Sequence, residues 1–98
     1  MVSSQQMKEN CQEVATLLKA IAHPQRLMIL CYLAQEELSV SELQSRCGIS
    51  QSQISQFLIR MTKEGLLSSR KVGSFTFYRL SDPKTIKLMK SMNKIFCE

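Results

Sequence analysis

Four cysteines and one histidine are the side chains of this 98-residue sequence best suited to metal or redox chemistry. Thiolates bind soft metals and exchange disulfides, and imidazole is a common metal ligand. The thiols lack the C-x₂₋₄-C spacing of a structural zinc site; they are Cys11, Cys31, Cys47 and Cys97. His23 directly precedes Pro24 and is interpreted as a helix-boundary residue. The pattern therefore predicts no ordinary metal site.

The sequence also lacks the patterns of an enzyme. The single histidine has no catalytic motif around it, so no nucleophile–base pair is recognisable, and no Gly-rich phosphate loop is present. Ninety-eight residues leave no room for a catalytic domain beside another module. We expect one domain over residues 1–98, with no enzymatic activity and no cofactor.

Residues 50–56 are rich in hydroxyl and amide side chains. Such side chains are poor core material, but they form hydrogen bonds with base edges and phosphates. Gln53 and Gln56 are suited to adenine, and basic residues near Gly73 are suited to the DNA backbone. The predicted DNA-contacting residues are Ser50, Gln51, Ser52, Gln53, Ser55, Gln56, Arg60, Arg70, Lys71 and Ser74.

A helix-turn-helix followed by a hairpin is expected to position these side chains. Ser39 and Glu42 form a Ser-x-x-Glu capping box that begins one helix, and Gly48 ends it. Ser50 is the expected N-cap of a second helix over residues 51–64. Residues 66–80 alternate like a hairpin around Gly73. This order is typical of a winged helix-turn-helix, which binds DNA.

Three further helices are expected over residues 7–21, 24–34 and 83–97. The fold is thus mainly α, with five helices plus a β-hairpin wing. The first and last helices carry apolar faces with no obvious place in a small core, so we expect them to pair across a two-fold axis. Such a dimer would set two recognition helices roughly 34–36 Å apart, matching successive major grooves. The alternative is that both helices fold back on their own domain.

The net charge of +5 is unevenly distributed. Basic and acidic residues balance over residues 1–69, so the excess lies in residues 70–98 and suits a polyanionic partner. The polar N-terminus lacks a signal-peptide core, and the longest apolar run, residues 27–34, is too short to span a membrane. We expect a cytoplasmic protein without membrane association, in which thiols are reduced.

This organisation resembles the ArsR/SmtB family of bacterial winged-helix repressors along nearly the whole chain. The matching segments are residues 17–20, 22–27, 37–43, 50–58, 65–67 and 77–80. The resemblance implies a homodimer that binds double-stranded operator DNA and leaves it when an inducer binds.

Metal sensors of this family carry ligands that this sequence lacks. Arsenic and cadmium sensors have a Cys-x-Cys motif where Ser39 and Ser41 stand here, and serine is a poor ligand for soft metals. Zinc and nickel sensors place Asp and His pairs along the last helix, which here contains no histidine. The resemblance therefore does not extend to these metal sites.

Cys31 and Cys97 stand in contexts similar to those of the redox- and persulfide-sensing BigR/SqrR/HlyU subgroup. The resemblance implies that they form a dithiol that reactive sulfur species or oxidants bridge, by a disulfide or a longer polysulfide link. Cys11 and Cys47 have no counterpart there. The alternatives are a metal sensor using Cys11, Cys31 and Cys97, or a constitutive or small-molecule-responsive repressor that needs no reactive thiol.

Overall fold

The computed structural model describes residues 2–97. Five helices and three strands follow one another along the chain: α1 (Ser4–Ile21), α2 (Pro24–Leu33), β1 (Leu38–Ser39), α3 (Val40–Cys47), α4 (Gln51–Lys63), β2 (Leu67–Val72), β3 (Phe75–Leu80) and α5 (Pro83–Cys97). The strands form one antiparallel sheet in the order β1-β3-β2. This architecture confirms the predicted mainly helical fold with a wing.

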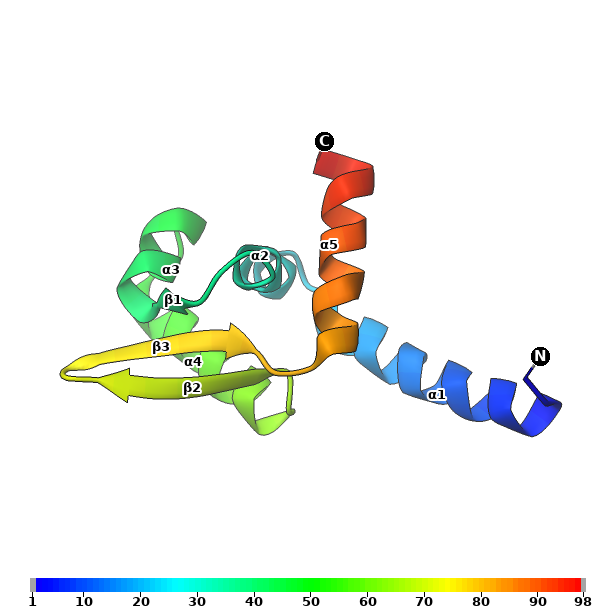
Figure 1. Ribbon diagram of the computed structural model, residues 1–98. Helices are drawn as coiled ribbons and strands as arrows, with labels where there is room; N and C mark the ends of the chain where they lie inside the picture. Colours follow the sequence, from blue (N-terminus) through cyan, green and yellow to red (C-terminus); the bar gives the residue numbers. More distant parts are fainter. Residues whose placement is uncertain (1, 98) are drawn as a thin grey trace.

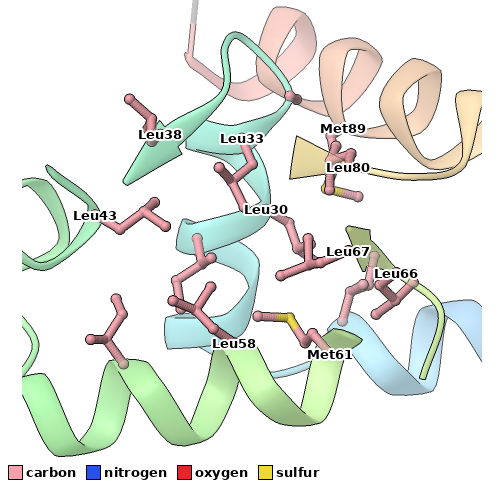
Figure 2. Close-up of a cluster of buried hydrophobic side chains, with 14 of the residues drawn as sticks. Leu30, Leu33, Leu38, Leu43, Leu58, Met61, Leu66, Leu67, Leu80 and Met89 are labelled. Carbon is pink, nitrogen blue, oxygen red and sulfur yellow. The ribbon is translucent and has the colours of Figure 1, made fainter. Parts of the chain in front are cut away.

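The helix α2 lies at the centre of the domain, between α3 and α5 (Figure 1). Its Ile29 and Leu30 are fully buried. Figure 2 shows Leu30 close to Leu58 and Met61, which line the inner face of α4. Burial of these side chains removes apolar surface from water, and this is the main force that fixes α2 against its neighbours.

Local capping signals set the ends of the helix-turn-helix. The Ser39 hydroxyl accepts a hydrogen bond from the Glu42 amide, and the Glu42 carboxylate accepts one from the Ser39 amide. Gly48 ends α3 with φ of +65°, a left-handed conformation that favours glycine. Ser50 caps α4. The predicted helix boundaries are therefore confirmed, because each depends on neighbours in sequence.

The wing is a hairpin of two six-residue strands with a third, short strand at its edge. Gly73 turns the hairpin with φ of +62°. β1 pairs with β3, so that Leu38 lies opposite Tyr78. The sequence did not predict β1, because two residues are too few to show strand alternation.

Parts of the apolar faces of α1 and α5 remain exposed within the described chain. α1 projects away from the body of the domain (Figure 1), and Met7 and Val14 are about half exposed. Ile95 and Phe96 near the end of α5 are 69% and 81% exposed. Met89 is fully buried in the core, so α5 packs the first part of its apolar face on its own domain. The exposed remainder of both helices needs a partner surface to be removed from water.

One side of α2 is only partly buried, although the sequence of this helix is mostly apolar. Met28 is 40% exposed, and Cys31 and Tyr32 are half-buried, because this side faces a cavity rather than the core. Within residues 2–97, no helix has both the length and the apolar character needed to cross a bilayer.

Candidate nucleic-acid interface and dithiol cavity

The first two turns of α4 present a polar, mostly exposed face. Gln51, Ser52 and Gln56 are exposed, and Ser55 is half-buried. The opposite face carries the buried Ile54, Leu58 and Met61, so the helix is held by its apolar side and displays its amides. This arrangement leaves the predicted base-reading side chains free to enter a groove.

Ser50 and Gln53 are engaged with each other at the start of α4. The Ser50 hydroxyl accepts a hydrogen bond from the Gln53 amide at 3.3 Å and donates one to the Gln53 side-chain oxygen at 3.2 Å. The side-chain nitrogen of Gln53 remains available as a donor. These contacts fix the orientation of Gln53 before any partner binds.

The wing and the helix-turn-helix together line a surface depression of about 490 Å³. Gln51 and Ser55 of α4 meet Ser74 of the wing turn there, although they are far apart in sequence. Ser39 and Ser41 also line this depression. Three of the predicted DNA-contacting residues thus lie on one hydroxyl- and amide-rich surface.

Arg70 in the wing is held by a carboxylate. Its guanidinium donates to both oxygens of Glu37, at 2.6 Å from Nη2 to Oε1 and 2.9 Å from Nε to Oε2, and lies 5.4 Å from the Phe77 ring centroid. These hydrogen bonds, together with the positive charge, lower the pKa of Glu37 below its usual range. Lys71 is exposed and makes no ion pair among the described residues.

No local sequence pattern indicates this pair, since its members are 33 positions apart. Strand register explains their proximity. Ser39 and Arg70 both lie opposite Phe77, on its two sides in the sheet, so Glu37 comes close to the wing when β1 adds to β3. The role of Arg70 as a DNA contact stays a prediction, and the structure adds an anchoring role.

Cys31 and Cys97 line one cavity of about 520 Å³ between α2 and α5. Cys31 is half-buried and Cys97 is exposed. The remaining lining is mostly apolar; it comprises Pro24, Leu27, Met28, Tyr32, Gln35 and Asn93. The structure therefore brings together the two cysteines that the family resemblance paired.

Burial raises the pKa of the Cys31 thiol, and the negative charge of a Cys97 thiolate raises it further. Cys31 consequently holds its proton at neutral pH. Burial also raises the pKa of Cys47. Cys47 packs against the hydrophobic core, and Cys11 is exposed on α1. Neither of these two cysteines lines the cavity.

No cluster of three or more His, Cys, Asp or Glu side chains suited to a metal ion occurs among residues 2–97. His23 caps α2, with its Nδ1 accepting from the Gln25 amide at 3.2 Å, and its ring lies 5.3 Å from that of Phe57. This confirms the helix-boundary interpretation of His23.

Comparison with known proteins identifies the family. A family model described as "Bacterial regulatory protein, arsR family" matches residues 23–69. The transcriptional activator HlyU of Vibrio cholerae is 39% identical over 94 residues, which cover 96% of this chain and 87% of HlyU. The chain belongs to the ArsR family. Proteins of this family are DNA-binding transcription regulators rather than enzymes, and this chain is accordingly a transcriptional regulator.

Solved structures support the same family and subgroup. Reduced HlyU superposes with a TM-score of 0.89 at 39% identity and covers 96% of this chain and 99% of its own. The transcriptional repressor BigR of Xylella fastidiosa gives 0.88 at 37% identity, covering 99% of both chains. A homodimeric winged helix-turn-helix DNA-binding domain from Mycobacterium bovis gives 0.75 at 27% identity, covering 95% and 86%. The matches to HlyU and BigR confirm the predicted relationship to their subgroup.

Proposed function

We propose that this ArsR-family regulator is a homodimeric repressor that leaves its operator when Cys31 and Cys97 of one protomer are bridged. The observation that carries the proposal is the cavity between α2 and α5, which both cysteines line. The similarity to BigR, described as a repressor, and to HlyU, described in a reduced form, supports it. The inducer is a reactive sulfur species or an oxidant, and the site of action is the bacterial cytoplasm, where thiols are reduced at rest.

The bridging chemistry balances with a persulfide as the oxidant. The exposed Cys97 thiolate attacks the outer sulfur of R–S–SH, forming a Cys97 persulfide and releasing RS⁻. Cys31 then loses its proton and attacks the Cys97 sulfur, closing the disulfide and releasing HS⁻. The two cysteines are oxidised by two electrons, and the sulfane sulfur is reduced to sulfide.

The bridge acts because it joins a core helix to a peripheral one. α2 packs against both α3 and α5. The exposed apolar faces of α1 and α5 form the dimer interface in this proposal, so restraining α5 against α2 alters the spacing of the two recognition helices. A dimer needs that spacing to match two half-sites one helical turn apart.

The DNA contacts follow from the exposed polar face of α4 and from the wing. Residues 50–56 enter the major groove, with Gln53 and Gln56 reading adenine through their amides. Arg60, Lys71 and Ser74 contact the backbone. Arg70 contributes mainly by holding the wing to Glu37. The operator is an imperfect palindrome that matches the two-fold axis of the dimer.

Four single serine variants test the dithiol proposal on a duplex that the protein selects from a random pool. Cys31→Ser and Cys97→Ser should bind the duplex as the parent protein does but keep it after polysulfide treatment. Cys11→Ser and Cys47→Ser are matched controls and should release it normally. Mass spectrometry of the treated parent protein should find Cys31 linked to Cys97. Normal release by both Cys31→Ser and Cys97→Ser would refute the proposal.

A further inference from the structure

Four basic side chains from three helices converge around a surface recess. Lys19 comes from the last turn of α1, Arg26 from the first turn of α2, and Arg60 and Lys63 from the last turn of α4. We call this set the basic recess. Its volume is about 550 Å³, and Glu64 is the one carboxylate in its lining. The balanced charge of residues 1–69 conceals it, because the balance holds along the chain and not in space.

The single carboxylate of the recess, that of Glu64, already forms an ion pair. Glu64 Oε1 lies 2.6 Å from Nη2 of Arg26, and the Arg26 side chain is only 13% exposed. The Nε of Arg26 is buried and has no hydrogen-bond partner in the described part of the chain. Lys19, Arg60 and Lys63 make no ion pair with any residue between 2 and 97. Three cations therefore line one recess without an ion pair of their own among the described residues, and their mutual repulsion favours an anion there.

The basic recess adjoins the base-reading face of α4. Gln56, Arg60 and Lys63 together line a second depression on the same helix. Lys63 lies seven residues beyond Gln56, which is about 10 Å along an α-helix. A group held in the recess would thus sit just outside a groove into which the start of α4 is inserted. This is where a duplex carries its phosphates.

We propose that the basic recess binds a phosphate group, with Lys19 and Lys63 as direct ligands. The adjoining position favours a phosphate of the DNA backbone flanking the half-site, which extends the interface from α4 to α1. This source rests on the proposed function, since it requires α4 to enter the major groove. A free phosphorylated molecule presents the same chemistry and is the other possible source. The internal Arg26–Glu64 pair serves to hold α2 against the end of α4.

The test compares Lys19→Ala and Lys63→Ala with Lys8→Ala, a control lysine on α1 that does not line the recess. Fluorescence anisotropy measures affinity for the selected duplex and for a scrambled duplex between 50 and 300 mM salt, conditions that span roughly the range where counterion release dominates. Calorimetry measures binding of inorganic pyrophosphate to the same proteins. All four proteins should give the same circular dichroism spectrum, since these lysines are exposed.

If the phosphate belongs to DNA, each recess variant makes the negative slope of log K against log salt shallower by about 0.9, equally for both duplexes. Lys8→Ala leaves this slope unchanged. With a free phosphate compound as the source, DNA binding is unchanged and the parent protein binds one pyrophosphate per protomer, which the recess variants lose. If neither slope nor pyrophosphate binding changes, the recess proposal is wrong. If the parent fails to distinguish the two duplexes, the proposed operator function fails, but the slope on either duplex still tests the recess.

Discussion

At the scale of residues, the two cysteines of the cavity are not equivalent. Cys97 is exposed, whereas Cys31 is half-buried on a core helix, and burial and the Cys97 charge both raise its pKa. Exposure suits Cys97 for the first attack on a bulky persulfide. Cys31 is suited to the second, intramolecular step, in which access from solvent is not needed.

This asymmetry predicts a pH dependence for the second step. Cys31 must lose its proton to attack, and its raised pKa keeps it protonated at neutral pH. The rate of bridge closure should therefore rise about tenfold per pH unit between pH 6 and 8, because the thiolate fraction rises tenfold per unit below the pKa. Acid quenching and mass spectrometry, counting the Cys97 persulfide and the bridged form at timed intervals, measure this rate.

The closure step is unimolecular, so titration of the persulfide reagent does not affect its rate. Once it has formed and the excess reagent has been removed, the Cys97 persulfide should persist longer at low pH. Cys31→Ser is the matched control and should stop at that species at every pH. A closure rate that stays flat from pH 6 to 8 would show that deprotonation of Cys31 is not limiting.

At the scale of elements, features set by sequence neighbours were predictable and those set by strand register were not. The capping box at Ser39, the Gly48 turn and the Ser50 cap each use residues within three or four positions, and all were predicted. The pair between Glu37 and Arg70 depends on β1 joining β3, which no local pattern indicates. The pairing of Cys31 with Cys97 was predicted from the family resemblance, because the spacing of the cysteines in the sequence does not indicate it.

The wing gives a prediction that separates its two basic residues. Lys71→Ala should make the negative slope of log K against log salt shallower by about 0.9 on every duplex, because an exposed, unpaired cation is lost. Arg70→Ala should change this slope by less than half as much, since Glu37 already offsets the charge of Arg70. Salt titrations of both variants, with Lys8→Ala as control, measure the difference. Equal slopes for the two wing variants would mean that Arg70 leaves Glu37 to bind phosphate.

At the scale of the whole molecule, the arrangement of helices brings together groups that the sequence keeps apart. Lys19 and Lys63 meet at one recess, and Cys31 and Cys97 at another cavity. Because basic and acidic residues balance along residues 1–69, the sequence did not indicate the basic recess. Both sites depend on the position of α2, because this helix contributes a residue to each. Arg26 lines the basic recess, and Cys31 lines the cavity between α2 and α5.

The exposed parts of the apolar faces of α1 and α5 lead to the last prediction. Phe96 is 81% exposed, so Phe96→Glu should leave the fold of the protomer intact but place a charge in the proposed dimer interface, where burial of an unpaired carboxylate is costly. Sedimentation at micromolar concentration should show a dimer for the parent protein and a monomer for the variant. Operator affinity should fall steeply, because a monomer engages only one half-site. Lys87→Glu, nine residues earlier and so about 180° around α5, is the control and should remain dimeric. A dimeric Phe96→Glu protein with unchanged operator affinity would place the two-fold axis elsewhere on the molecule.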